Sequence, residues 1–441
     1  MEQNFRHCPK FGSDKVGSEV MKKYIPRIID SVLETRLRRS GAVLIKGPKW
    51  CGKTTTASMR SKSILNLQNP KMREKYLETA ATDPLSLLDG DKPRLLDEWQ
   101  IAPNLWDAVR QAVDSIGKPG QFILTGSSVP PLEKGMHSGA GRISELLMRT
   151  MSLYESGDSN GRVSLGKLFE GRGEPITSPS GLGLEDVAFC TVRGGWPFAL
   201  TLSADDATKI AGDYLETIVN RNISEIDGVT RSPARVWKVI RSLARNTSTP
   251  ATLETIRKDM SGDGIPVSTK TISEYLGALE RLYVTENLEA WSPALRSRTV
   301  MRATPKRHFT DPSIACAALS ASPEDLLQDR NTFGFLFESL CVRDLRVYAD
   351  ALEGNVFHYR DKNNLEVDAV VHLRNGKWGA VEIKLSPRGV DDAAENLKRF
   401  SEKINHERMR EPSFLMVLTV DDLAYRRQDG VYVVPIGCLG P

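Results

Sequence analysis

The sequence predicts an α/β protein in three parts, at residues 20–204, 205–300 and 301–441. Three observations support this division. Near the N-terminus a strand-like run leads into a glycine-rich loop and a helix, the middle holds two helices joined by a Gly/Pro turn, and the last third holds a long helix followed by a hairpin. At 441 residues the chain is too long for one ordinary core, which agrees with two or three domains.

The glycine-rich loop at residues 47–54 reads GPKWCGKT and fully matches the phosphate-binding pattern G-x-x-x-x-G-K-[ST]. An apolar run at 42–45 enters it as a buried strand would, and 54–59 leaves it as the first turns of a helix. We expect Lys53 to reach the β and γ oxygens of ATP and Thr54 to hold Mg²⁺. The N-terminal end of the helix adds to the same anion site. The expected nucleotide-binding residues of the loop are Gly47, Pro48, Lys49, Trp50, Cys51, Gly52, Lys53, Thr54 and Thr55.

An acidic pair follows the loop at a spacing of about 40 residues, which is usual for such domains. A second strand is expected at 63–67 and a third at 93–97, which delivers Asp97 and Glu98 at its end. In that position Asp97 would hold Mg²⁺ through water, and Glu98 would polarise the attacking water. The alternative is a strand that simply ends in a solvated Asp-Glu.

A further buried strand is expected at 121–125, and it ends in polar residues. Thr125 or Ser128 would face the γ-phosphate, as in ATPases whose additional strand lies between the loop strand and the acidic strand; an ordinary Gly-Ser-Ser turn is the alternative. The segment 149–154 is the expected fifth strand. Arg142 and Arg149 are candidates for an arginine finger, with surface salt bridges as the competing role.

The order of these motifs resembles a known group of proteins. GPKWCGKT, LLDEWQ, FILTGSS, GR, MRTMSL and RGGWP follow one another as in predicted bacterial and archaeal AAA-superfamily ATPases that carry a C-terminal domain of unknown function. The resemblance covers nearly the whole chain and implies an ATPase with Walker A and Walker B motifs. Trp50 and Cys51 depart from the Gln- or Arg-rich loop interior usual in that group, while the fixed loop residues are unchanged.

The middle of the chain has a winged-helix pattern. A helix is expected to begin at Ser232-Pro233, and helices at 252–260 and 268–282 precede a strand at 283–291. Lys270 and Thr271 lie near the exposed start of the second of these, where a recognition helix would touch DNA. A contact with protein instead of DNA is left open. A basic stripe on the first helix either tracks a phosphate backbone or is a solvated face. Its members are Arg231, Arg235, Lys238, Arg241 and Arg245.

In the last third, a helix around 335–348 carries Glu338, and strands at 365–372 and 378–384 flank an Asn-Gly turn. Glu382 and Lys384 project to one face of the second strand and would converge beside Asp368. This set resembles the PD-(D/E)XK nuclease core. The resemblance implies that Asp368 and Glu382, with the carbonyl of residue 383, ligate Mg²⁺, that Lys384 orients or activates the water, and that Glu338 assists. An edge hairpin with a Glu/Lys cross-pair is the alternative.

Composition excludes some classes of protein. Hydrophobic residues make up 40% and charged residues 26%, and no run approaches the ~18 apolar residues of a membrane span. The N-terminus lacks the apolar region of a secretory signal, and the six cysteines form no C-x-x-C pair, so we expect a cytosolic protein with reduced thiols. A net charge of +4 neither demands nor excludes nucleic acid.

Two functional hypotheses follow from these features. In the first, an Mg²⁺-dependent ATPase is coupled to a nuclease-like module that acts on DNA or RNA. In the second, the chain is an ATP-gated signalling or assembly switch whose nuclease-like domain is an inactive docking platform. Neither hypothesis fixes whether the chain forms a homo-oligomer.

Overall fold

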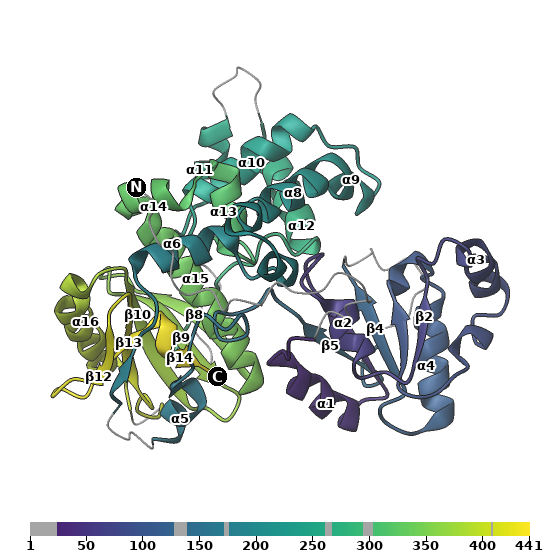
Figure 1. Cartoon of the computed structure of the whole chain (residues 1–441), viewed down its shortest axis with the longest axis horizontal. Helices are drawn as coiled ribbons and strands as arrows, with labels where there is room; N and C mark the ends of the chain where they lie inside the picture. The colour runs from purple at the N-terminus through teal and green to yellow at the C-terminus, as the bar shows by residue number, and fades with distance from the viewer. Residues whose placement is uncertain (1–23, 128–138, 172–175, 261–266, 294–302, 407–408) are drawn as a thin grey trace, which may run out of the picture.

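The computed structural model describes residues 24–127, 139–171, 176–260, 267–293, 303–406 and 409–441. Figure 1 shows a sheet domain from the N-terminal part of the chain (purple to blue), a group of helices from the middle (teal), and a second sheet from the C-terminal part (green to yellow). The two sheets lie on opposite sides of the view, and the long helix α15 (Arg330–Ala351) lies beside the second sheet.

Within the described residues, the N-terminal sheet has five parallel strands in the order β2-β3-β4-β1-β5. The additional strand β4 therefore lies between the loop strand β1 and the acidic strand β3, as predicted. The strands are β1 (Ala42–Lys46), β2 (Ser63–Asn66), β3 (Arg94–Asp97), β4 (Phe122–Gly126) and β5 (Ile143–Leu147).

The predicted fifth strand at 149–154 is wrong, because β5 ends at Leu147. The backbone of β5 pairs in register with β1, and this pairing continues only as far as the bond from Met148 N–H to the Lys46 carbonyl. Beyond that point the chain turns toward the C-terminal part, where the Leu153 N–H donates to the Asp344 carboxylate. Residues 149–154 therefore contact another part of the chain and do not pair as a strand.

The alternation of side chains on a strand gives the N-terminal sheet two cores. Ala42 and Leu44 of β1 belong to the core under α3 and α4, whereas Val43 and Ile45 belong to the core under α1 and α2. Both faces of the sheet are therefore covered, which explains why its strands read as continuous apolar runs. The covering helices are α1 (Ile29–Arg39), α2 (Lys53–Ser58), α3 (Arg73–Thr82) and α4 (Leu105–Ile116).

The middle of the chain contains the predicted helices, and α10 begins directly after Ser232. Ser268 caps α12 by accepting a hydrogen bond from the Thr271 N–H. The expected strand at 283–291 forms only isolated bridges, including Thr285 with Phe309 and Leu288 with Lys306. The helices are α7 (Ala204–Ala207), α8 (Ile210–Thr217), α9 (Ile223–Glu225), α10 (Pro233–Arg245), α11 (Leu253–Met260), α12 (Thr269–Arg281), α13 (Pro312–Leu319) and α14 (Pro323–Gln328).

The C-terminal sheet has the order β7-β12-β13-β11-β10-β9-β8 in the part of the chain that the structure describes. Strands β8, β9 and β10 are antiparallel, whereas β10, β11 and β13 are parallel. Helices α15 and α16 (Val390–Lys403) both contact β9 and β10, but their apolar residues belong to different cores. The strands are β8 (Gly354–Arg360), β9 (Glu366–Leu373), β10 (Trp378–Lys384), β11 (Leu415–Thr419), β12 (Leu423–Arg426) and β13 (Tyr432–Pro435).

Residues before the predicted boundary at 204 pair with the C-terminal part of the chain. Strand β6 (Val163–Ser164) pairs with β14 (Leu439–Gly440), and β7 (Ser178–Pro179) pairs with β12. Helices α5 (Leu165–Glu170) and α6 (Leu184–Arg193) contribute to one hydrophobic core that runs from Leu153 to Leu439. Among the described residues, this core therefore contains side chains from both sides of the predicted boundaries at 204 and 300.

The described residues contain no helix that is both long and apolar enough to cross a lipid bilayer. Helix α15 is 22 residues long, but its buried face carries charged residues, among them Arg343 and Asp344.

A buried carboxylate joins three parts of the chain. Asp311, at the start of α13, is fully buried and accepts hydrogen bonds from Thr150 Oγ1 (2.6 Å), the Gly195 N–H (3.0 Å) and Arg343 Nη1 (3.1 Å). Burial alone would raise the pKa of Asp311, but the charge of Arg343 and these hydrogen bonds hold it below its usual value. Only glycine fits at 195, because a Cβ there would lie 2.1 Å from the Met151 carbonyl oxygen. This close approach explains why the second glycine of the RGGWP motif, at residues 193–197, has no side chain.

We predict that Asp311→Ala destabilises the protein by about 3–5 kcal/mol, because it leaves the buried Arg343 guanidinium without one of its two carboxylates. Urea unfolding followed by tryptophan fluorescence measures the change. The control is Glu254→Ala, which removes an exposed ion pair with Arg257 and should shift stability by no more than about 0.5 kcal/mol. Equal unfolding midpoints for the two variants would contradict the assigned role of Asp311.

Candidate functional site

The phosphate loop has the backbone geometry that its glycines predict. Gly52 has a φ of 101° and Gly47 a φ of 152°, and a Cβ on Gly47 would lie 2.1 Å from the Met148 carbonyl oxygen. The Lys53 side chain is buried in the loop, where its Nζ donates to the carbonyls of Gly47 (3.0 Å) and Pro48 (2.7 Å). The ammonium group thus lies inside the loop, held by two of the loop's own carbonyl groups. Lys49 is partly buried, and Thr54 and Thr55 are exposed on the first turn of α2.

The two unusual loop residues point in different directions. Trp50 is 48% exposed, adopts a positive φ of 67°, and packs edge-on against Tyr214 of α8. Cys51 is fully buried among the apolar residues under α1 and α2, and its thiol approaches the Met148 carbonyl oxygen at 3.4 Å. Cys51 therefore fills space in the core, while Trp50 connects the loop to the middle of the chain.

Arg27, which the sequence analysis did not select, supports the loop from behind. Its Nη1 donates to the Cys51 carbonyl (2.9 Å), its Nη2 donates to the Arg149 carbonyl (2.9 Å), and its Nε pairs with Glu155 (2.9 Å). All of these groups except Arg149 are buried. The guanidinium thus fixes the loop backbone to the segment that leaves the sheet domain.

The acidic end of β3 lies beside the loop, as predicted. Asp97 Oδ1 accepts hydrogen bonds from Thr54 Oγ1 (2.8 Å) and from Thr125 Oγ1 (2.6 Å). A carboxylate and two hydroxyl groups from α2, β3 and β4 therefore meet at the carboxyl end of the parallel strands. Hard oxygen donors of this kind suit Mg²⁺, so the residues present fit the expected cation.

Glu98 directly follows Asp97 in a left-handed backbone conformation (φ 57°), and its N–H donates to Thr125 Oγ1 (3.2 Å). The Glu98 carboxylate accepts hydrogen bonds from Ser127 Oγ (3.2 Å) and from the Gln100 amide. Ser127 and Gln100 are partners that sequence reasoning missed, although Ser127 lies one residue from the predicted Ser128. Ser128 itself lies outside the described residues.

Neither arginine selected as a finger faces the phosphate loop of its own chain. Arg142 pairs with Asp114 at the surface, and its carbonyl accepts from the Ala42 N–H, so it lies at the amino end of β1, opposite the loop. The side chain of Arg149 is 9% exposed and pairs with Glu286 (2.8 Å) and Asp350. A role for Arg142 as an arginine finger therefore stays a prediction, whereas Arg149 joins the sheet domain to the rest of the chain.

The C-terminal residues predicted to converge do so. Asp368 lies on β9, Glu382 and Lys384 lie on the neighbouring β10, and Glu338 lies on α15. Lys384 Nζ is 2.9 Å from Glu382 Oε2 and 3.8 Å from Asp368 Oδ2, which also accepts from the Ile383 N–H (2.9 Å). We call Glu338, Glu366, Asp368 and Glu382 the carboxylate cluster.

A second lysine, missed by the sequence analysis, is inserted into the carboxylate cluster. Lys306 Nζ lies 2.9 Å from Glu338, 3.2 Å from Glu366 and 3.2 Å from Asp368, and its side chain is only 3% exposed. Among the described residues, no group of three or more His, Cys, Asp or Glu side chains is arranged to hold a metal ion. The cluster as it stands therefore does not fit the predicted Mg²⁺, because an ammonium group lies among its carboxylates.

Electrostatics in the cluster follow from burial and mutual repulsion. Burial raises the pKa of Glu338 to about 8, with a further contribution from the negative charge of Asp368. Burial and Asp368 likewise raise the pKa of Glu382 to about 8. Burial alone would raise the pKa of Asp368 too, but Lys306 and Lys384 hold it below its usual value. Asp368 is thus the carboxylate that stays charged between two ammonium groups.

Surface charge in the middle of the chain differs from the predicted stripe. Arg235, Arg241 and Arg245 are exposed on α10, but Arg231 is 8% exposed and pairs with Asp227 (2.7 Å), so it does not belong to the stripe. Lys270 is exposed at the start of α12. A cleft of about 700 Å³ is lined by both acidic and basic side chains, so it is not a basic groove. Its lining includes Lys46, Asp227, Arg231, Glu274, Glu280 and Arg281.

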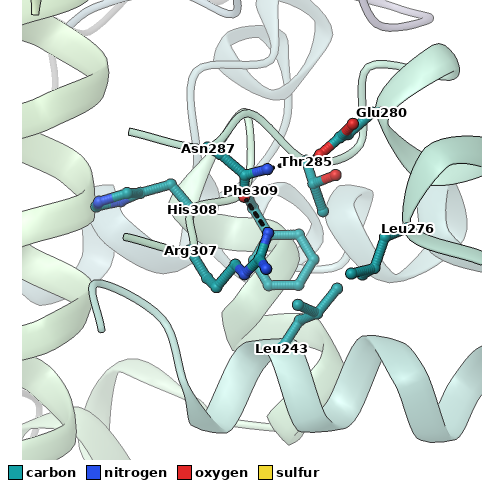
Figure 2. Close-up of a pocket in the computed structure, with 8 residues that line it drawn as sticks. All are labelled: Leu243, Leu276, Glu280, Thr285, Asn287, Arg307, His308 and Phe309. Atoms are coloured by element: carbon teal, nitrogen blue, oxygen red, sulfur yellow. Dashed lines mark hydrogen bonds between the residues drawn. The ribbon is translucent and has the colours of Figure 1, made fainter. Parts of the chain in front are cut away.

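A small enclosed cavity lies between α10, α12 and the segment around Phe309 (Figure 2). Its volume of about 10 Å³ is close to the minimum for one water molecule, so it is no ligand site. Figure 2 shows a chain of hydrogen bonds beside it, from Arg307 to Asn287 (3.2 Å) and from Asn287 to Glu280 (2.6 Å). Arg307 neighbours Lys306, so these bonds help to position the segment that carries the inserted lysine.

Family models match three parts of the chain. Residues 39–156 match a family described as an AAA domain, residues 184–325 match a domain of unknown function (DUF8612), and residues 333–439 match another domain of unknown function (DUF4143). The N-terminal part of the chain is therefore an AAA-type P-loop domain, which confirms the resemblance for that part.

Two proteins of similar sequence are described only as uncharacterized. One from Mycobacterium bovis and one from Mycobacterium tuberculosis are each 27% identical to this chain over 368 residues, which cover 80% of this chain and 72% of each relative. Among solved structures, the Walker-type ATPase PABY2304 of Pyrococcus abyssi aligns with a TM-score of 0.42 and 15% identity, over 68% of this chain and 97% of that one.

Two buried histidines lie close to Lys306. Burial lowers the pKa of His358, on β8, to about 4, and the charge of Lys306 adds to this effect. Burial also keeps the pKa of His308 well below its usual value, with Arg346 and Lys306 contributing. Both rings are therefore neutral in the folded protein at pH 7.

We predict that protonation of His358 weakens the fold as the pH falls. In the unfolded chain this histidine has a pKa of about 6.5. Its folded pKa is lower, so stability present above pH 6.5 is lost toward pH 4. This group alone should lower the free energy of unfolding by about 2 kcal/mol between pH 7 and pH 5, since one pKa unit corresponds to about 1.4 kcal/mol.

Urea unfolding at the two pH values checks this prediction. His358→Gln should show a smaller loss than wild type, whereas His406→Gln, which replaces an exposed histidine, should behave as wild type does. The same pH dependence in all three proteins would contradict the prediction.

Proposed function

We propose that this chain binds ATP with Mg²⁺ at the phosphate loop and hydrolyses it. The observation that carries the proposal is the meeting of Thr54, Asp97 and Thr125 beside Lys53. These residues come from α2, β3 and β4, and their hydrogen bonds bring one carboxylate and two hydroxyl groups together. The match of residues 39–156 to an AAA domain supports the same proposal.

Each residue has a distinct role in this proposal. Lys53 exchanges its hydrogen bonds to the loop carbonyls for bonds to the β and γ oxygens of ATP. Thr54 and Asp97 hold Mg²⁺, which when bound neutralises charge on the phosphate oxygens. Glu98 orients the attacking water, and Ser127 and Gln100 hold its carboxylate in place.

We propose that nucleotide binding influences the rest of the chain, because direct contacts connect the phosphate loop to it. Arg27 joins the Cys51 carbonyl of the loop to the Arg149 carbonyl, and the Arg149 side chain pairs with Glu286. Trp50 of the loop also packs against Tyr214 of α8. A shift of the loop on binding ATP would directly change its contacts with Arg27 and Tyr214.

For the C-terminal module two roles remain in competition. Cleavage of DNA or RNA is supported by the convergence of Glu338, Asp368, Glu382 and Lys384, and by exposed arginines on α10 that suit a nucleic-acid contact. An inactive docking platform is supported by Lys306, whose ammonium lies among the same carboxylates. We favour the platform, because the Lys306 ammonium lies 2.9 Å from Glu338 and 3.2 Å from Asp368, where a metal ion would have to compete with it.

The ATPase proposal predicts different effects for two variants. Lys53→Ala should weaken ATP binding at least tenfold, because the loop loses its one cation directed at the β and γ oxygens. Glu98→Gln should still bind ATP but turn over roughly 10²-fold more slowly, because it keeps the shape and loses the basic group. Phosphate release and equilibrium binding of a fluorescent ATP analogue measure the two quantities.

The control is Glu74→Gln, on the exposed start of α3, which should match wild type in both assays. Unchanged turnover in Glu98→Gln would remove Glu98 from the role assigned to it. Unchanged binding in Lys53→Ala would remove the proposed nucleotide site.

The two roles of the C-terminal module are separated by incubation with supercoiled plasmid and Mg²⁺ or Mn²⁺. The platform predicts that wild type, Asp368→Ala and Lys384→Ala all nick DNA at the same background rate. Faster nicking by wild type, lost in both variants, would contradict the platform and establish cleavage at the predicted residues.

A further inference from the structure

The position of Lys306 differs from that of an ordinary surface lysine. Its side chain is 3% exposed, and three carboxylates from α15 and β9 surround its ammonium at 2.9–3.2 Å. Asp368 shares its two oxygens between the lysines: Oδ1 faces Lys306 at 3.2 Å and Oδ2 faces Lys384 at 3.8 Å. The charged carboxylate of the cluster is thus enclosed by cations that belong to the protein.

The backbone of Lys306 is fixed from the other side. Its N–H donates to the Leu288 carbonyl (3.0 Å) and its carbonyl accepts from the Leu288 N–H (2.9 Å). The next residue, Arg307, is bonded through its backbone to Ser248 and Thr249. Lys306 is therefore anchored by the middle of the chain while its side chain reaches into the C-terminal cluster.

The acidic side chains around Lys306 explain why a positive charge is favourable at the centre of the carboxylate cluster. Glu338, Glu366 and Asp368 all face the Lys306 ammonium, and the negative charge of Asp368 adds to burial in raising the pKa of Glu338. Burying a lysine is costly unless it is paired, and here Asp368 provides a charged partner while Glu338 and Glu366 add two further acidic oxygens. A divalent cation prefers the same type of oxygen ligand, so the ammonium group and a metal ion would compete for one position.

We propose that Lys306 takes the place of a divalent cation in the carboxylate cluster, so that wild type binds none there, and that a neutral residue at 306 opens a divalent-cation site on Glu338, Glu366 and Asp368. The inference rests on the C-terminal module described under the proposed function and explains how the resemblance to a nuclease core and the lack of a fitting metal site coexist.

Binding of Mn²⁺ in the absence of nucleotide tests the proposal, with electron paramagnetic resonance measuring free Mn²⁺. Lys306→Met should gain one site per chain with at least tenfold higher affinity than any site of wild type. Lys306→Met combined with Asp368→Asn should lose that gain, because the charged ligand is removed. Lys362→Met, which replaces an exposed lysine of the same domain, should bind as wild type does.

Lys306→Gln provides a second neutral variant, whose amide can still donate to Glu338, and it should show the same gain. Circular dichroism and thermal unfolding establish that each variant is folded. If a folded variant gains no Mn²⁺ site, or if wild type already binds one Mn²⁺ at the cluster in an Asp368-dependent manner, the proposal is overturned. It also fails if neither neutral variant folds, since Lys306 would then be required for the fold itself.

The result is distinguishable from the outcome of the function tests. Mn²⁺ binding is measured without ATP and without DNA, so loss of ATPase activity or absence of nicking leaves it unaffected. A Lys306→Met protein that binds Mn²⁺ but cuts no DNA would support this inference while leaving the platform role intact.

Discussion

The hydrogen bonds that Asp97 accepts from Thr54 and Thr125 fix the candidate nucleotide site before any ligand arrives. They bind the first turn of α2 to the ends of β3 and β4, and so hold the phosphate loop against the acidic strand. Thr125 also accepts the Glu98 N–H, which places the two acidic residues relative to each other. The position of Lys53, the strained conformation of Glu98 and the supporting contacts of Ser127 and Gln100 all depend on this edge of the sheet.

Arginine and lysine side chains, rather than apolar surfaces alone, join the parts of the chain. Arg27 connects the loop to Glu155, Arg149 connects the sheet domain to Glu286, Arg343 pairs with Asp311, and Lys306 reaches Asp368. A buried cation is strongly unfavourable without its partners, so each of these contacts demands one relative placement of the segments. These four contacts therefore fix how the segments that they join are placed relative to one another. The same chemistry that secures the fold at Lys306 also determines what the carboxylate cluster can bind.

The sequence predicted local features well, because each follows from a short pattern. The phosphate loop, the strand ending at Asp97 and the hairpin before Lys384 needed only spacing and periodicity. The place of β4 between β1 and β3 was predicted from the likeness to additional-strand ATPases. Lys306 and Arg27 were missed because their partners are distant: Lys306 and Asp368 are 62 residues apart, and Arg27 and Glu155 are 128 apart. No periodicity connects such pairs. The strand predicted at 149–154 failed for the same reason, since contacts with the C-terminal part determine its path.

The central claim is that Asp97 and its hydroxyl partners form a cation-dependent nucleotide site. Isothermal titration calorimetry of ATP into folded wild-type protein, with Mg²⁺ and again with EDTA, tests this claim most directly. We expect one site per chain in Mg²⁺ and at least tenfold weaker binding in EDTA. No heat in Mg²⁺, or equal affinity in both buffers, would contradict the account.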